Sequence, residues 1–297
     1  MQNTLIIDGK AISAAIKEEV REQAAELKTQ HGIVPGLAFL LVGENPASQS
    51  YVRSKERACE YCGFHSSTVT MPASASEREI LARIDAWNID PDIHGILVQL
   101  PLPDHVNEDC VIEAISPRKD VDGFHPVNVG KLVIGQEAFL PCTPAGIQEL
   151  LIRSGIETAG KHVVVVGRSN IVGKPIANIL LQKTAGANAV VTVTHSAAED
   201  IGLYTRMADI LIVATGRVNT VTAGMVKDGV VVIDVGINRV EDASRERGYR
   251  IVGDVDFEGV MERASAITPV PGGVGPMTIA MLMKNTFRSA ERSAAGR

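Results

Sequence analysis

This 297-residue chain has few aromatic side chains, few cysteines and no excess of positive charge. Aromatics make up only 4% of it, so its cores must be aliphatic, which is typical of parallel α/β sheets. The formal net charge of -6 argues against a nucleic-acid or membrane-surface protein, because either would need a basic face. No run approaches the roughly 18 apolar residues of a membrane span, and no signal peptide is visible. We therefore expect a cytoplasmic protein that binds neither nucleic acid nor a membrane.

The cysteines are too few and too scattered to build a metal site. Of the four, Cys59 and Cys62 have the CxxC spacing that is found in zinc and redox sites. Cys110 and Cys142 lie far apart, and the seven histidines form no ligand pair, so the second half of a zinc site is missing. We predict no metal, and we expect Cys59 and Cys62 to be small buried residues of a helix.

The first half of the chain alternates helices and strands. With 45% apolar residues, the chain has material for two ordinary domains. The segment GLAFLLV at 36–42 predicts a strand that is buried on both faces. A long irregular stretch follows at 116–130, and stretches of this length are usually functional. The expected helices are 11–30, 50–62, 76–88 and 107–115, and the other expected strands are 64–70 and 95–99.

The second half repeats βα units. We place the domain boundary near Pro141–Pro144, where Thr143 is suited to cap a helix that runs to about 154. Repeated βα units with buried strands indicate a doubly wound parallel sheet, and such sheets bind ligands at the carboxyl ends of their strands. The expected strands are 162–166, 190–194, 210–214, 230–234 and 266–268, and a last helix is expected over 277–288.

A glycine loop follows the first strand of this second half. Residues 167–175, GRSNIVGKP, connect that strand to a helix with Pro175 in its first turn. Backbone N–H groups and the helix dipole at such a point bind phosphate. The loop departs from GxGxxG, so an ordinary βα turn is an alternative interpretation. Its position in the first unit of a doubly wound sheet favours a dinucleotide.

The end of the next strand bears on the choice between NAD and NADP. An NAD enzyme usually has a carboxylate there to hold the ribose 2′-hydroxyl. This strand ends Thr194-His195-Ser196, and Arg168 lies in the glycine loop. A cation and a hydroxyl without an acid favour the 2′-phosphate of NADP. Glycines near Thr215 and Ile237, after later strands, would let a ligand approach the backbone.

The first half carries a scattered polar set. Tyr51 and Lys55 share one helix face at i and i+4, although such a pair is by itself usually a surface pair. Gln99 is the polar residue at the end of an apolar strand, where ligand sites form; an alternative interpretation is that its amide satisfies loop backbone groups. Asp120 and Asp122 flank the turn at Gly123, where aspartates often cap their own backbone.

Together these segments resemble the bifunctional methylenetetrahydrofolate dehydrogenase/methenyltetrahydrofolate cyclohydrolase family. The resemblance covers nearly the whole chain, and the order of its motifs makes it specific. The motifs are YVRSK at 51–55, GILVQLPLP at 95–103, KDVDG at 119–123, PCTP at 141–144, GRSNIVGKP at 167–175, DVGIN at 234–238 and PGGVGPMT at 271–278.

The resemblance implies two α/β domains around a cleft, the second of them Rossmann-like, in a homodimer. The folate-binding catalytic domain would be 1–141 plus 277–297, and the NADP-binding domain 142–276. The implied reactions are oxidation of 5,10-methylenetetrahydrofolate by NADP+ and hydrolysis of the methenyl product to 10-formyltetrahydrofolate.

The resemblance also implies roles for single residues. Lys55 would be essential for the hydrolysis, Tyr51 would stack on the folate, Gln99 would bond near Lys55, and Asp122 would hold the pterin. The expected cofactor contacts are Gly167, Arg168, Ser169, Ser196, Thr215 and Ile237, and Leu100, Pro271 and Gly272 complete the expected substrate contacts.

Two other functions remain open. One is a different NADP-dependent oxidoreductase that acts on a small hydroxy or amino acid. The other is a non-catalytic dinucleotide-binding protein. Neither would require Tyr51, Lys55, Gln99 and Asp122 together, so this first-half set discriminates against both.

Overall fold

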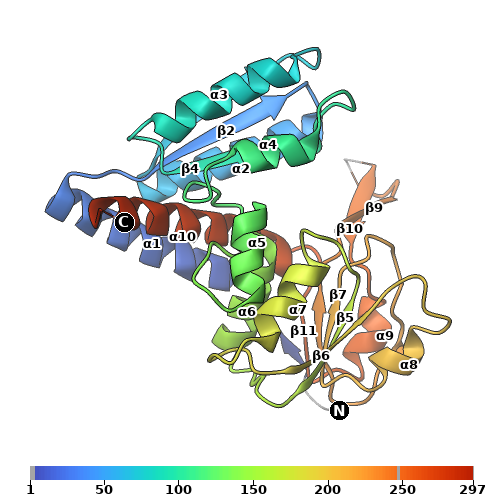
Figure 1. The fold of residues 1–297 in the computed structure, drawn as a ribbon. Helices are drawn as coiled ribbons and strands as arrows, with labels where there is room; N and C mark the ends of the chain where they lie inside the picture. Colours follow the sequence, from blue (N-terminus) through green and yellow to red (C-terminus); the bar gives the residue numbers. More distant parts are fainter. Residues whose placement is uncertain (1–3, 246–247, 297) are drawn as a thin grey trace. The chain divides into compact units, whose positions relative to one another are not determined.

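The computed structural model describes residues 4–245 and 248–296, and it divides into two compact units (Figure 1). The six-stranded unit holds residues 143–278 and the described N-terminal residues up to Ser13. The three-stranded unit holds residues 14–142 and the described residues from Ile279 onwards. Within the described residues, no helix is both long enough and apolar enough to cross a membrane.

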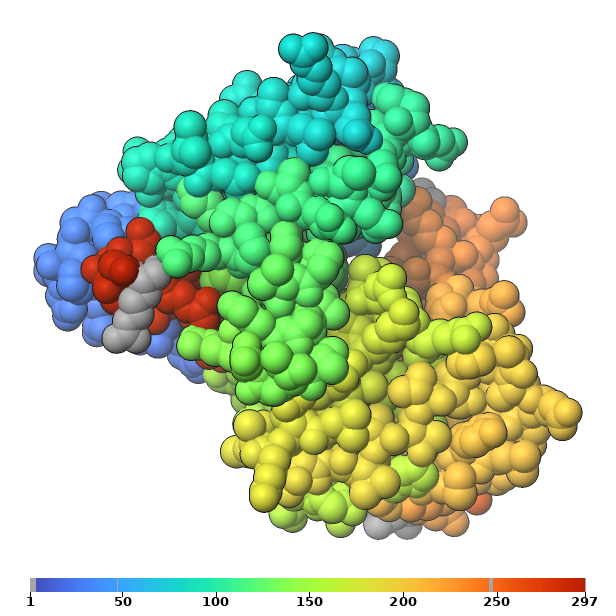
Figure 2. All heavy atoms as spheres, in the orientation of Figure 1, coloured from blue at the N-terminus to red at the C-terminus, as the bar shows by residue number. Residues whose placement is uncertain are grey.

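The three-stranded unit is built on a parallel sheet of order β3-β2-β4. Its central strand, β2 (Gly36–Val42), is buried at every residue because it pairs with a strand on each side and is covered on both faces. Helix α3 forms part of the outer surface of this unit (Figure 2). The other strands are β3 (His65–Met71) and β4 (Gly95–Val98), and the helices are α1 (Gly9–His31), α2 (Pro46–Cys62), α3 (Glu77–Ile89), α4 (Glu108–Ala114), α5 (Pro126–Val133) and α10 (Val274–Ala294).

The six-stranded unit contains a fully parallel sheet of order β1-β11-β8-β7-β5-β6. The predicted doubly wound sheet is therefore confirmed. Its valine-rich centre is buried, since helices cover it. The strands are β1 (Leu5–Ile6), β5 (His162–Val166), β6 (Val190–Thr194), β7 (Ile210–Val213), β8 (Val231–Asp234) and β11 (Ala266–Ile267), and the other elements are α6 (Cys142–Arg153), α7 (Gly173–Leu181), α8 (Gly202–Thr205), the 3₁₀ helix η1 (Ala223–Met225), the antiparallel hairpin β9 (Asn238–Glu241) with β10 (Tyr249–Val252), and α9 (Phe257–Met261).

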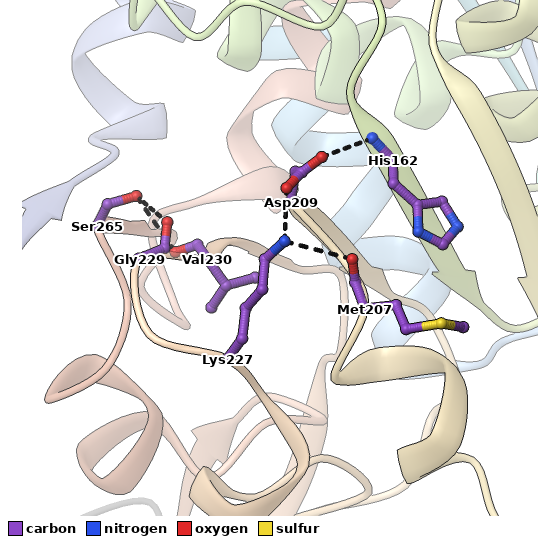
Figure 3. Close-up of polar contacts among 7 residues, drawn as sticks. All are labelled: His162, Met207, Asp209, Lys227, Gly229, Val230 and Ser265. Carbon is purple, nitrogen blue, oxygen red and sulfur yellow. Dashed lines mark hydrogen bonds and ion pairs between the residues drawn. The ribbon is translucent and has the colours of Figure 1, made fainter.

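Polar contacts tie together the amino ends of this sheet (Figure 3). The Asp209 carboxylate accepts hydrogen bonds from the backbone N–H of His162 at 2.8 Å and from Lys227 Nζ at 2.5 Å. The Ser265 hydroxyl donates to the carbonyl of Gly229 at 2.7 Å. These bonds fasten the loops at the amino ends of the strands, whereas doubly wound sheets bind ligands at the carboxyl ends.

The structure corrects the expected domain assignment at the N-terminus. Residues 4–13 group with the six-stranded unit, in which β1 pairs with β11 through Leu5 and Ile6, and not with the three-stranded unit. Two residues are too short to leave a readable pattern in the sequence, and a paired two-residue strand depends on the partner strand that the rest of the fold supplies.

Three local expectations were also wrong. The long irregular stretch contains helix α5, which starts at Pro126 with His125 as its cap. Thr143 does not cap α6, because that helix begins one residue earlier; its hydroxyl instead bonds that of Thr278 at 2.8 Å. The last helix begins earlier and runs further than expected, and the buried Ser289 is anchored to the carbonyl of Arg118.

Candidate active site

The structure brings Lys55 and Gln99 into direct contact within the three-stranded unit. Lys55 lies on α2, and Gln99 directly follows β4. Lys55 Nζ donates a hydrogen bond to Gln99 Oε1 at 3.0 Å. Gln99 Nε2 donates to the carbonyl of Leu100 at 2.8 Å. The amide is therefore held by the loop backbone so that its oxygen faces the ammonium. The contact with Lys55 and the contact with the loop backbone are compatible, because they use the oxygen and the nitrogen of the same amide.

Burial and opposite charge act against each other at this site. Burial lowers the pKa of Lys55, and the nearby Asp122 carboxylate opposes that effect. Burial raises the pKa of Asp122, and Lys55 opposes that effect in turn. Tyr51, one helical turn before Lys55 on α2, is 50% exposed. The arrangement presents an amine of lowered pKa, a carboxyl group and an exposed aromatic ring.

The two aspartates of the loop have different surroundings. Asp120 is buried, and its carboxylate accepts from the backbone N–H groups of Gly123 at 3.1 Å and His125 at 2.9 Å. Asn128 Nδ2 donates to it at 2.8 Å. Asp120 is thus the one that caps its own turn. Its bonds shape the loop so that the charge of Asp122 acts on Lys55.

Two residues near Asp122 were missed by the sequence analysis. The thiol of the buried Cys142 donates to the carbonyl of Val121 at 3.3 Å, and burial raises its pKa well above the usual range. Asn285 Nδ2 on α10 donates to the carbonyls of Val121 at 2.9 Å and Leu140 at 3.0 Å. Cys142 stands in the motif PCTP at 141–144, which was the available signal for it. Asn285 carried no signal, because its role depends on where α10 packs.

The glycine loop of the six-stranded unit is held by very close backbone contacts. Gly167 has φ +127°, and a Cβ there would lie 2.2 Å from the carbonyl oxygen of Ala214. A Cβ on Gly173 would lie 2.3 Å from the carbonyl oxygen of Gly167. The Ser169 hydroxyl accepts from the N–H of Gly173 at 3.3 Å, at the start of α7. Arg168 is exposed. Only glycine fits at Gly167 and Gly173, because neighbouring backbone atoms occupy the position that a Cβ would take.

Two buried carboxylates organise the loops after β7 and β8. The Asp254 carboxylate accepts from the N–H and hydroxyl of Thr215, at 2.6 and 3.0 Å, and from the N–H of Gly216 at 2.9 Å. The Asp234 carboxylate accepts from the N–H groups of Gly236 and Asp254, both at 2.9 Å. Burial raises the pKa of Asp234 to about 6. The sequence analysis gave neither carboxylate a role, since Asp254 binds backbone about 40 positions away and Asp234 binds the backbone of Asp254 as well as that of the nearby Gly236.

The remaining predicted contacts all lie in the six-stranded unit. Ser196 is exposed just after β6, and Ile237 is 52% exposed just after β8. Pro271 is exposed, and the buried Gly272 has φ +112°. The substrate contacts predicted at Pro271 and Gly272 therefore belong to a different unit from Lys55, Gln99 and Asp122.

The six-stranded unit fits a dinucleotide. Gly167 packs against the carbonyl of Ala214 too closely for any Cβ, and its loop leads into the N-terminus of α7, where backbone N–H groups can bind a phosphate. Between β6 and Asp200 the chain carries a carboxylate only at Glu199, five residues past the strand. The exposed Arg168 guanidinium is available to an added phosphate.

Comparison with known proteins agrees with these observations. The family described as "Tetrahydrofolate dehydrogenase/cyclohydrolase, catalytic domain" matches residues 7–122, and that family's "NAD(P)-binding domain" matches residues 141–294. The "Bifunctional protein FolD" of Prosthecochloris aestuarii is 58% identical, with 97% of this chain and 99% of that protein covered.

Solved structures agree as well. A bifunctional FolD methylenetetrahydrofolate dehydrogenase/cyclohydrolase from Campylobacter jejuni has a TM-score of 0.92 at 53% identity, covering 97% of this chain and 99% of that one. The Trypanosoma brucei enzyme, complexed with NADP cofactor and inhibitor, has a TM-score of 0.93 at 42% identity and covers 99% of both chains. The chain therefore belongs to the tetrahydrofolate dehydrogenase/cyclohydrolase family, with a catalytic domain followed by an NAD(P)-binding domain.

Proposed function

We propose that this chain oxidises 5,10-methylenetetrahydrofolate to 5,10-methenyltetrahydrofolate with NADP+ and then hydrolyses the methenyl compound to 10-formyltetrahydrofolate. Family membership gives the pair of reactions. The observation that carries the proposal is the bond between Lys55 and Gln99 beside Asp122, because a dinucleotide-binding protein without this chemistry has no need of it.

The oxidation needs positioning more than acid or base catalysis. NADP+ takes the hydride from the methylene carbon, so the protein has only to hold two ligands close and aligned. In the proposal, the backbone around Gly167 and Ser169 holds the pyrophosphate, and Arg168 pairs with the 2′-phosphate, assisted by Ser196. Thr215 and Ile237 lie at later strand ends of the same sheet and contact the cofactor there.

The hydrolysis needs a proton acceptor. Water adds to the methenyl cation, and a proton must leave before the ring opens to the formyl product. A neutral lysine amine can accept that proton once its pKa has been lowered. Burial already lowers the pKa of Lys55, and the positive charge of the substrate lowers it further. Gln99 keeps the nitrogen in place through its carbonyl oxygen.

The remaining side chains hold the folate. The Asp122 carboxyl group pairs with the adjacent N–H groups of the pterin, as a carboxylate does with two parallel donors. The exposed ring of Tyr51 stacks on the ligand. Leu100, Pro271 and Gly272 complete the proposed contacts. We further expect a homodimer, and we expect it to work in the cytoplasm.

An absorbance assay tests this function. Purified protein is mixed with 5,10-methylenetetrahydrofolate and either NADP+ or NAD+, and the methenyl and reduced-nicotinamide bands are followed together. Methenyltetrahydrofolate alone is then added, and its decay is compared with the rate in buffer. Reduction with NADP+ and accelerated decay are expected. Folded protein that reduces neither nucleotide would contradict the proposal and favour a different oxidoreductase.

A further inference from the structure

A hollow lies in the three-stranded unit, at the opposite end of β4 from Gln99. Its volume is about 450 Å³, within the usual range for a small-molecule site. Its walls come from the segment before β4, the loop between α4 and α5, α5 itself, the loop after α5, and α10. It shares no residue with the set around Lys55. The lining residues that matter here are His94, Arg118, Lys119, Lys131, Glu137 and Arg292.

The charge of this hollow is opposite to that of the whole chain. Four cations line it with a single carboxylate, although the chain carries a formal net charge of -6. That carboxylate, on Glu137, pairs with Arg292 at 2.5 Å. Arg118 and Lys131 have no ion pair among the described residues, so their charge is not neutralised by the protein. Such an excess of positive charge in a concave site attracts anions.

Lys119 is fixed in place without a carboxylate bond. Its Nζ donates to the backbone carbonyls of Trp87 at 2.8 Å and Asp90 at 2.7 Å. An ammonium has three donors, so one remains for a ligand. The Asp90 carboxylate acts on the pKa of Lys119 but does not line the hollow. A pre-positioned ammonium costs little entropy when it binds.

His94 adds a buried donor of fixed tautomer. It is only 6% exposed, and its Nδ1 accepts a hydrogen bond from the N–H of Gly36 at 3.0 Å. The other ring nitrogen must then carry the proton. Burial and the neighbouring Lys119 lower the pKa of His94, which keeps the ring neutral. Within the described residues Nε2 has no hydrogen-bond partner, and the residue lines the hollow.

We propose that this hollow binds a small phosphate compound that carries at least two negative charges, with inorganic pyrophosphate as the simplest example. Guanidinium, ammonium and imidazole N–H donors are the groups that bind phosphate oxygens. The hydroxyls of Ser116 and Ser293 also line the hollow and supply further donors. The site is separate from the proposed dinucleotide site, since that site belongs to the six-stranded unit.

The single tryptophan gives a local signal. Trp87 is 4% exposed, its carbonyl holds Lys119, and the next residue, Asn88, lines the hollow. We would titrate the full-length chain with pyrophosphate at constant ionic strength, recording Trp87 fluorescence and the heat of binding. The variants are Arg118→Ala and Lys131→Ala. The charge-matched control is Arg78→Ala, which removes an exposed cation of α3 that does not line the hollow.

Saturable binding of one pyrophosphate per chain at this site is expected, and each lining variant should weaken it about tenfold, as the loss of a charge-assisted bond does. Arg78→Ala should bind as the parent does. Arg168→Ala, in the proposed dinucleotide loop, should also leave the Trp87 titration unchanged. Absence of saturable binding by both methods at millimolar pyrophosphate would overturn the proposal. So would equal weakening in the Arg78 variant, or loss of the signal in the Arg168 variant.

Discussion

At the residue scale, the candidate site is a balance between two charged groups, Lys55 and Asp122, whose burial opposes their charge. Lys55 and Asp122 each shift the pKa of the other toward the charged form, while burial shifts both toward neutrality. Gln99 is neutral, so it positions Lys55 Nζ without adding a charge to this balance. A change of charge at Lys55 or Asp122 therefore changes the protonation of the other.

Replacing Asp122 by Asn should shift the pH profile of the hydrolysis. The carboxylate raises the pKa of Lys55, so its removal lowers that pKa, and more of the amine is neutral at a given pH. If Lys55 is the base, the rise of kcat with pH moves to lower pH. The KM for folate should rise in both reactions, because a pterin partner is lost. An unshifted profile would contradict the coupling, and the exposed Asp104→Asn serves as the control.

Replacing Arg168 by Ala should reveal the basis of cofactor choice. The loss of a charge-assisted contact to the 2′-phosphate should weaken NADP binding roughly 10- to 100-fold. NAD has no such phosphate, so its affinity should stay within about twofold of the parent value. Equilibrium titration with each nucleotide measures both numbers on the same protein. Equal losses for NADP and NAD would mean that Arg168 contacts a part that the two share.

The sequence indicated the residues of the candidate site more clearly than the residues that hold their loops in place. Local pattern drew attention to Lys55 through its partner at i-4 and to Gln99 at the end of an apolar strand, but their roles came from the family resemblance. Local pattern also left Asp120 and Asp122 alike, since both stand in the same turn, and it was the resemblance that singled out Asp122. Asp254 and Asn285 act on backbone groups tens to hundreds of positions away, and no local pattern records such a bond.

At the element scale, the buried strands were the most predictable parts. β2 and β5 have the expected bounds, because a continuous apolar run between turn residues has few other stable forms. β6 also has the expected bounds, although it is a partly exposed edge strand. The short elements were not predictable. β1 depends on its pairing with β11, and the hairpin of β9 and β10 carries a charged, half-exposed sequence. α5 was hidden by the glycines and the proline around it.

Replacing Gly167 by Ala should damage the end of β5 and the proposed phosphate loop together. The new Cβ would lie 2.2 Å from the carbonyl oxygen of Ala214, at φ +127°. We expect a loss of more than about 2 kcal/mol in stability and a strong loss of NADP affinity. Gly160→Ala is the control, since φ there is +70° and the space is open; it should cost only about 1 kcal/mol. Equal melting temperatures and NADP affinities in the two variants would argue against the loop as the site.

Helix α10 should affect folate binding although it lies far along the chain from Lys55. Asn285→Ala leaves the carbonyls of Val121 and Leu140 without this donor, which should cost about 1–3 kcal/mol. The segment before Asp122 then loosens, so the folate KM should rise. Thr286→Val on the same helix removes only a bond to the carbonyl of Leu282 and should leave the KM unchanged. A KM that rises equally in both variants would show a general effect of α10.

At the scale of the whole molecule, each of the two units is built from two separate segments of the chain. The six-stranded unit takes its edge strand from the N-terminus, and the three-stranded unit takes α10 from the C-terminal part of the chain. The return of the last helix was expected from the resemblance, whereas the placement of residues before Ser13 was not. Composition and periodicity predict the fold class, but the assignment of terminal segments depends on pairing partners that are distant in sequence.

The central claim is that the cluster of Lys55, Gln99 and Asp122 supplies the base for the hydrolysis, whereas the oxidation by the same chain needs no base. The most direct measurement is the rate of both reactions in Lys55→Met, which keeps the length and apolar stem of the side chain but removes its nitrogen. Hydrolysis of methenyltetrahydrofolate should fall by about 10²- to 10⁴-fold, the usual loss when a general base is removed. Substantial NADP-dependent oxidation of methylenetetrahydrofolate should remain, because hydride transfer needs no base. Equal loss of both activities in a folded protein would contradict the claim.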